Sequence, residues 1–184
     1  MYIDKLVNLI SPSNRLDTVS VMKNIELVEK HFNIKYPDDY INYITQYGVG
    51  QINDFITIYV PINSNAYYEE TKNICQNYRD CREMFPNEYR HNVFPEKGGL
   101  LPLGVTDGGS EIWWKTDIEK EKWTIVVYDE NSWEYEEYKM LLCEFLYKYF
   151  IREIDCIGFP ESLREEMAYF TRYEFDFKKY CSSL

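Results

Sequence analysis

The sequence contains little of what metal and thiol chemistry needs. Its 184 residues include two histidines and five cysteines, and no two cysteines are spaced as C-x-x-C. No zinc-binding framework is visible in that set, and we expect no metal and no cofactor. The odd number of cysteines and the lack of an N-x-[ST] glycosylation motif favour free thiols in a reducing cytoplasm.

Long apolar runs are also missing. The first ten residues are apolar but short, Asp4 interrupts them, and they lack both a basic start and a small-residue cleavage site. No other run approaches the ~20 residues of a membrane-spanning helix. We therefore expect neither a signal peptide nor a membrane span, and a cytoplasmic protein.

Two glycine-containing segments resemble nucleotide-binding loops only in composition. Gly48-x-Gly50 has Asn53 where a third glycine would stand, and residues 104–110 lack a Gly-Lys-[Ser/Thr] sequence. A helix cap and a hairpin turn explain the two segments better.

No catalytic triad is expected, because neither histidine has a candidate nucleophile beside it. Paired carboxylates stay open as a hydrolase site, since 31 acidic residues offer many pairs.

Acidic residues and tyrosines, in contrast, are abundant. The chain has 31 Asp and Glu against 20 Lys and Arg, a net charge of −11, and 18 tyrosines. Such a chain repels phosphate backbones and anionic membrane surfaces, so we expect no nucleic-acid partner and no membrane partner. The same field attracts basic proteins and speeds their encounter. Tyrosine suits half-buried positions and interfaces, because its body is apolar and its tip polar.

The order of elements predicts a single α+β domain over residues 1–184. Apolar residues at 3.6-residue spacing predict helices toward both ends, and β-rich runs predict consecutive strands between them. Short connections favour antiparallel pairing, which gives a central, mostly antiparallel sheet with N-terminal and C-terminal helices packed on it. We expect helices in residues 1–10, 18–32, 37–47, 65–84, 140–154 and 161–180, and strands at 55–60, 100–103, 110–115, 123–128 and 133–138.

The densest charge feature is the segment 129–137, which holds five carboxylates, two aromatic residues and no basic residue. One interpretation is a polar hairpin tip that prevents edge-to-edge aggregation. The other is a protein interface, in which aromatic anchors lie inside an acidic rim. Both interpretations can hold at once.

Several segments occur in an order that is typical of one known family. Tyr36-Pro-Asp-Asp-Tyr40 follows a helix and leads to Tyr47-Gly48, and residues 101–114 read LPLGVTDGGSEIWW. The strand WTIVVY and a helix containing Glu144 come later in the chain. This ordered set resembles the SMI1/KNR4 family, also called the SUKH superfamily, and is most similar to its bacterial immunity proteins. The resemblance covers roughly residues 20–152.

Two parts of the chain depart from the family pattern. Ser110 stands beside Glu111 where the family more often has a Gly-Asp pair, which leaves the register of that hairpin open by one residue. An insert at about 64–98 and a tail at about 155–184, expected to be helical, match nothing in the pattern. Partner specificity could therefore lie in either segment.

The resemblance implies a SUKH-like fold and an immunity protein, an antitoxin that binds and neutralises one cognate polymorphic toxin. Such proteins are not enzymes and need no cofactor. A nuclease-type toxin domain would be basic because it binds phosphates, which agrees with the acid surplus. The alternative is a non-enzymatic regulatory scaffold of the SMI1/KNR4 type. From the charge pattern we predict these partner-binding residues: Asp107, Glu111, Asp129, Glu130, Trp133, Glu134, Glu136 and Glu137.

Overall fold

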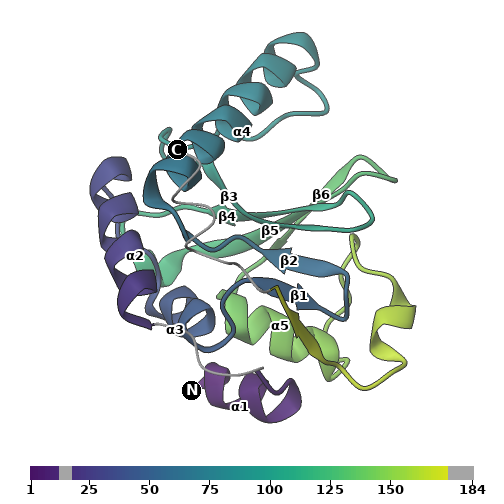
Figure 1. Ribbon diagram of the computed structural model, residues 1–184. Coiled ribbons are helices and arrows are strands. Elements are labelled where there is room, and N and C mark those ends of the chain that lie inside the picture. The colour runs from purple at the N-terminus through teal and green to yellow at the C-terminus, as the bar shows by residue number, and fades with distance from the viewer. Residues whose placement is uncertain (13–17, 174–184) are drawn as a thin grey trace.

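The structure is a computed structural model, and it describes residues 1–12 and 18–173 (Figure 1). Within these residues it contains five α-helices and one seven-stranded sheet. The helices are α1 (Tyr2–Leu9), α2 (Thr18–Phe32), α3 (Asp38–Gln46), α4 (Ser64–Met84) and α5 (Leu142–Phe150). The strands are β1 (Gly50–Ile52), β2 (Ile56–Ile58), β3 (Leu100–Thr106), β4 (Glu111–Lys115), β5 (Thr124–Asp129), β6 (Glu134–Tyr138) and β7 (Phe170–Arg172).

The sheet is antiparallel throughout and has the strand order β6-β5-β4-β3-β2-β1-β7. Helices α1, α3 and α5 lie on one face of the sheet, and α4 lies on the other (Figure 1). Helix α2 packs beside α3 and α4 at one side of the molecule. The predicted α+β class, with a central antiparallel sheet and helices packed on it, is therefore confirmed.

Two adjacent tryptophans show how the sheet is buried on both faces. Successive side chains of a strand point to opposite faces, so Trp113 and Trp114 of β4 point in opposite directions. The ring of Trp114 makes an edge contact with Tyr40 of α3 at 6.2 Å, and that of Trp113 makes one with Tyr78 of α4 at 5.5 Å. Both indoles are almost fully buried. One strand thus ties together the main core and a smaller core under α4.

Helix α3 joins the first half of the fold to the last helix. Its Asp39 carboxylate accepts a hydrogen bond of 2.7 Å from the backbone N–H of Cys143, in the first turn of α5. This satisfies an N–H group that a helix start leaves unpaired. Burial raises the pKa of Asp39, although the hydrogen bonds from Cys143 act in the opposite direction.

The insert at 64–98 contains the helix that the sequence predicts. Residues 64–84 form α4, and the loop that follows returns beside it to β3. The helix is capped by Asn63, whose side chain accepts hydrogen bonds from the backbone N–H groups of Asn65 and Ala66. Because α4 covers the second face of the sheet, the insert completes the fold.

The helical tail predicted for 155–184 is wrong over the residues that the structure describes. Residues 161–164 form a short 3-10 turn, and Phe170–Arg172 form β7, which pairs with β1. Phe170 packs on the ring of Tyr47 at 5.1 Å, and Gly50 makes room for β7, because a Cβ at Gly50 would lie 2.2 Å from the Thr171 carbonyl oxygen. The free edge of β1 therefore decides the structure of this segment. The part of the predicted helix from residue 174 onward lies outside the described residues.

Candidate partner-binding surface

Three tight turns lie at the same end of the sheet, because consecutive antiparallel strands run in opposite directions and every second connection therefore returns to the same end. They connect β1 to β2, β3 to β4 and β5 to β6. We call this surface the turn end and define it as residues 53–54, 107–111 and 129–134. It holds six acidic residues and no lysine or arginine.

The β1–β2 turn is a two-residue hairpin loop. Asn53 and Asp54 both have positive φ angles, 51° and 48°, as a type I′ turn requires. The Asn53 side chain donates a hydrogen bond of 2.9 Å to the Leu163 carbonyl oxygen, and Asp54 accepts one of 3.0 Å from the Tyr169 hydroxyl. The turn is thus fixed to the segment before β7. Sequence reasoning missed Asp54, although asparagine and aspartate between two short apolar runs are a recognisable signal of this turn.

The β3–β4 and β5–β6 turns touch each other. Gly109 has a φ of 87°, and a Cβ at this glycine would lie 1.8 Å from the Glu130 Oε2 atom. Asp107, in the first of these turns, is exposed and accepts a hydrogen bond of 2.8 Å from the side chain of Gln51. The structure therefore brings Asp107 and Glu130 together with the β1–β2 turn on one surface.

Asp129 is a structural residue of the β5–β6 turn. It is 8% exposed, and its carboxylate accepts hydrogen bonds from the Ser132 hydroxyl at 2.7 Å and from the backbone N–H groups of Asn131 and Ser132 at 3.2 Å. Burial raises the pKa of Asp129, but the hydrogen bonds from Ser132 and Asn131 outweigh it, so the pKa lies below its usual value. This carboxylate is directed into the turn, whereas Glu130 beside it is exposed.

Glu111 is half-buried at the start of β4. Its carboxylate accepts a hydrogen bond of 3.0 Å from the indole N–H of Trp113. Burial raises the pKa of Glu111, the hydrogen bond from Trp113 lowers it, and the charge of Glu130 raises it further. Two acidic side chains of the turn end are therefore close enough to repel each other, and no cation offsets that repulsion within the described residues.

Trp133 is the exposed aromatic residue of the turn end. Its side chain is 59% exposed, and its backbone has a φ of 60°. Its N–H donates a hydrogen bond of 2.8 Å to the Asp129 carbonyl oxygen, which closes the turn. Glycine or asparagine is usual at such a position, and a bulky residue there is an outlier that costs about 1–3 kcal/mol. A large apolar group is thus displayed at a position where a small residue would fit the backbone better.

The three glutamates of β6 do not act together. Glu134 and Glu136 point to one face of this edge strand, and Glu137 points to the other. Glu137 forms an ion pair of 2.6 Å with Lys115 and accepts a hydrogen bond from Thr124. Glu136 accepts a hydrogen bond from the Tyr138 hydroxyl. Glu134 belongs to the turn end, while Glu137 faces the opposite end of the sheet.

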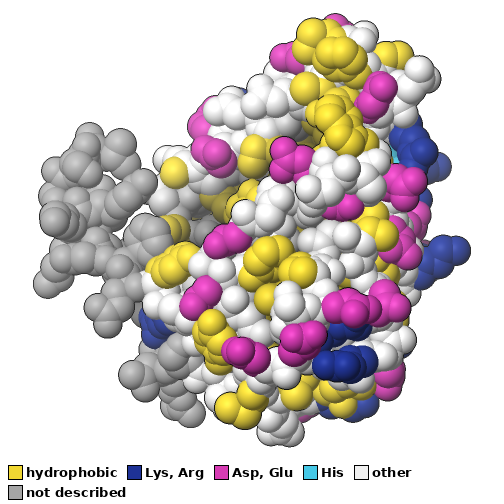
Figure 2. Space-filling view, turned by 90° about the vertical axis from the view of Figure 1, so that its right-hand side faces the viewer, with side chains coloured by type: hydrophobic (Ala, Val, Ile, Leu, Met, Phe, Trp, Pro, Cys, Tyr) yellow, Lys and Arg dark blue, Asp and Glu magenta, His cyan; other side chains and the backbone are white. Residues whose placement is uncertain are grey.

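Ion pairs neutralise acidic residues elsewhere and leave the turn end uncompensated. Among the described residues, ion pairs engage Glu29, Glu69, Glu96, Glu119, Glu121, Glu137 and Glu144, as well as several aspartates. None of them includes a carboxylate of the turn end. Figure 2 faces this end: carboxylates are spread across it among hydrophobic side chains, and most lysines and arginines lie toward the right and lower margins.

The described residues include groups that can bind a partner, but they form neither a metal-binding cluster nor a pair between the carboxyls of Asp39 and Glu111. Within residues 1–12 and 18–173, no group of three or more His, Cys, Asp and Glu side chains is placed to hold a metal ion. Asp39 and Glu111, two half-buried carboxyls with raised pKa values, lie on opposite sides of the sheet and form no pair. None of the helices that the structure describes is both long and apolar enough to cross a bilayer.

Comparison with known protein families identifies the family of this chain. The family model SUKH_6, described as SMI1-KNR4 cell-wall, matches residues 22–146. The chain therefore belongs to the SMI1-KNR4 (SUKH) family. The match includes α4 and all strands except β7, so the insert lies within the family's domain. No curated protein and no solved structure matches the chain.

Proposed function

We propose that this SUKH protein is a non-enzymatic immunity protein, which binds and neutralises a toxin domain with a basic surface in the cytoplasm. The observation that carries the proposal is the turn end, where six carboxylates lie without an ion pair among the described residues. A nuclease-type toxin must present cations to hold phosphates. An acidic inhibitor can approach that same surface and replace the charge of the substrate.

Trp133 gives the proposal its apolar component. Charge steers partners and sets the association rate, but buried aromatic anchors supply most of the binding free energy. At the turn end, Trp133 is exposed, and the acidic residues Glu130 and Glu134 lie close to it in the sequence. This combination, an aromatic residue within a charged rim, is typical of protein interfaces.

The proposal is tested by titrating this chain with the toxin domain encoded beside its gene. One variant carries Asp107→Lys, Glu130→Lys and Glu134→Lys at the turn end. The matched control carries Asp117→Lys, Glu119→Lys and Glu121→Lys at the opposite end of the sheet. Each variant changes the net charge from −11 by +6 to −5, so that the two variants have the same net charge and carry the change at opposite ends of the sheet.

We expect the turn-end variant to bind about 100-fold more weakly, mainly through a slower association that depends less on salt. The control should stay within about threefold of the unmodified chain, because exposed charges outside an interface contribute little. Equal weakening in both variants would mean that net charge, and not the turn end, attracts the partner. No binding by the unmodified chain would end the proposal.

A further inference from the structure

The end of α4 exposes two large apolar side chains at a second place on the molecule. Met84 is 64% exposed and Phe85 is 53% exposed. We call residues 80–91 the α4 tip. In Figure 2 hydrophobic side chains gather at the top, over the end of α4, and the turn end lies on the same face below them.

The α4 tip is also rich in acidic residues, with three carboxylates and two arginines, whereas the turn end has no arginine. Asp80, Glu83 and Glu88 flank the two apolar side chains in the sequence, and among the described residues none of these carboxylates forms an ion pair. The two arginines on this part of α4 are both directed to Glu96: Arg82 Nη2 lies 2.9 Å and Arg79 Nε 3.9 Å from Glu96 Oε1. They therefore offset Glu96, and Arg90, the other arginine of the tip, lies over the Tyr135 ring, so the three acidic residues of the tip form no ion pair among the described residues.

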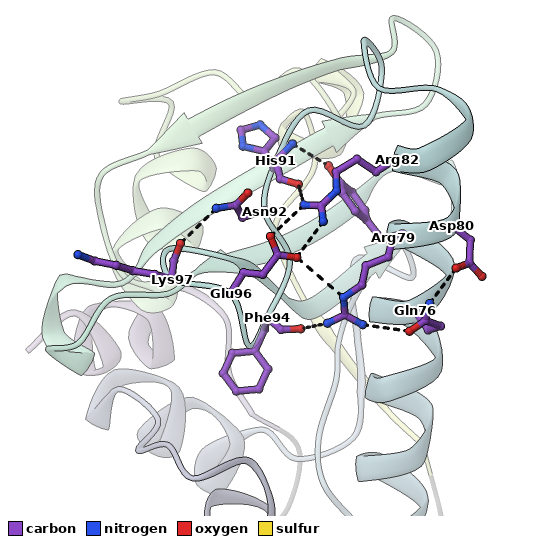
Figure 3. Close-up of polar contacts among 10 residues, drawn as sticks. Gln76, Arg79, Asp80, Arg82, His91, Asn92, Phe94, Glu96 and Lys97 are labelled. Atoms are coloured by element: carbon purple, nitrogen blue, oxygen red, sulfur yellow. Dashed lines mark hydrogen bonds and ion pairs between the residues drawn. The ribbon is translucent and has the colours of Figure 1, made fainter.

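The tip is held rigidly by the loop that returns to β3 (Figure 3). Arg82 donates hydrogen bonds to the His91 carbonyl oxygen at 3.0 Å and to both carboxylate oxygens of Glu96, at 2.9 and 3.2 Å. Arg79 donates to the Phe94 carbonyl oxygen. A helix end that is fixed before binding loses less conformational entropy when a partner orders it.

The tip adjoins the turn end through an aromatic contact. His91 and Tyr135 of β6 have ring centroids 4.8 Å apart, and the Arg90 guanidinium lies 5.8 Å from the centre of the Tyr135 ring. Burial raises the pKa of Tyr89 to about 12, and the neighbouring charges, including that of Glu111, add to the effect. Residues 89–91 of the tip thus lie against β4 and β6, where those strands meet the turn end.

We propose that the α4 tip is a second arm of the partner-binding surface, with Phe85 and Met84 as its apolar contacts on the same basic protein. This inference rests on the proposed function. A second copy of this chain fits the tip poorly, because it would bring two sets of unpaired carboxylates together. A basic partner surface with apolar pockets complements both arms at once, and contact with both explains why two exposed apolar sites share one acidic face.

The test uses the full chain and the toxin domain encoded beside its gene. Phe85→Ala is compared with Ile118→Ala, which removes an apolar side chain that is 89% exposed at the opposite end of the sheet. We expect Phe85→Ala to weaken binding about 20-fold and Met84→Ala about fivefold, as for residues at the centre of an interface. Ile118→Ala should change affinity less than twofold, and hydrogen exchange at residues 80–91 should slow in the complex.

The outcomes separate this inference from the proposed function. If Phe85→Ala binds as the unmodified chain does while the turn-end charge variant binds weakly, the second arm is wrong and the proposed function stands. If the toxin domain binds and neither variant weakens it, both surfaces are wrong. A toxin domain that does not bind at all overturns both proposals. Glu96→Gln, which weakens one of the contacts between the returning loop and Arg82 and leaves Phe85 in place, should weaken binding about threefold through the loss of preorganisation.

Discussion

The two ends of the sheet differ in how their charges are arranged. At the end opposite the turns, residues 115–122 hold three lysines and three acidic residues. Ion pairs join Lys115 to Glu137 at 2.6 Å and Lys122 to Glu119 at 2.5 Å, and Lys120 to Asp38 of α3. The turn end holds six acidic residues and no lysine or arginine. The acid surplus is therefore concentrated on one surface and is neutralised on another.

The backbone φ angles also differ between the two ends of the sheet. At the turn end the bulky residue Trp133 has a positive φ angle, and no residue of the segment 115–122 has one. Local strain persists where the surrounding structure fixes it, and it is found most often at functional positions. The opposite end thus has features that favour stability, and the turn end has features that cost stability and remain available to a partner.

The sharpest test of this comparison is Asp129→Ala. Asp129 is the acidic residue of the turn end that is buried and bonded within its own turn. Its loss leaves the N–H groups of Asn131 and Ser132 without their acceptor, and we expect the free energy of unfolding to fall by about 2 kcal/mol. Urea unfolding followed by tryptophan fluorescence measures the change.

Glu130→Ala is the matched control, since Glu130 is the next residue and is exposed. It should change the free energy of unfolding by less than about 0.5 kcal/mol, as most exposed substitutions do. If the two variants are equally destabilised, the carboxylates of the turn end are structural as a group, and the difference between the two ends is no evidence of binding.

Much of the fold could be predicted from the sequence. The hairpins were predictable because their apolar runs are bounded by turn residues such as Asp107-Gly-Gly109. Helix α3 was predictable from a proline and two aspartates at its start, followed by apolar residues at helical spacing. In both cases the local pattern and the tertiary packing favour the same structure.

The remaining features depend on contacts that are distant in the sequence. Strand β7 forms because the edge of β1 is free and Gly50 leaves space beside it, and no pattern within residues 161–173 reveals that edge. Asp129 lies in an acidic run that reads as exposed, yet its position in the turn and its contact with Ser110 bury it. The acidic residues could be located by sequence, but their burial and their ion pairs could not.

Smaller changes in the free energy of unfolding are expected when one glutamate at each end of the sheet is replaced by glutamine. Burial raises the pKa of Glu111, so its ionised form destabilises the fold. Burial also raises the pKa of Glu137, but the hydrogen bond from Lys115 and other favourable contacts outweigh it and lower the pKa, so ionised Glu137 stabilises the fold. At pH 7 we expect Glu111→Gln to raise the free energy of unfolding by about 1 kcal/mol and Glu137→Gln to lower it by about 0.5 kcal/mol.

The two effects respond differently to pH. The cost of ionised Glu111 is absent below its unfolded pKa of about 4.3 and is complete once the pH exceeds its raised folded pKa. The stabilisation from Glu137 is complete above the unfolded pKa and is lost as the pH falls through the lowered folded pKa. Urea unfolding at pH 7 and at pH 3 should show both differences shrinking in acid. A Glu111→Gln variant less stable than the unmodified chain at pH 7 would contradict this account.

Trp133→Gly is also expected to change the stability only slightly, and the sign of that change separates folding from function. Glycine adopts a φ of 60° without the steric cost that tryptophan carries, although it also loses more freedom on folding. Because the side chain is mostly exposed, little packing is lost, and we expect the free energy of unfolding to rise by about 0.5 kcal/mol. The same variant should bind the toxin domain at least about tenfold more weakly, because the aromatic anchor is gone. Trp133→Phe keeps an aromatic ring and should retain most of the affinity. A Trp133→Gly chain that is less stable and binds unchanged would mean that Trp133 serves the turn itself, and that the strain at the turn end belongs to the fold.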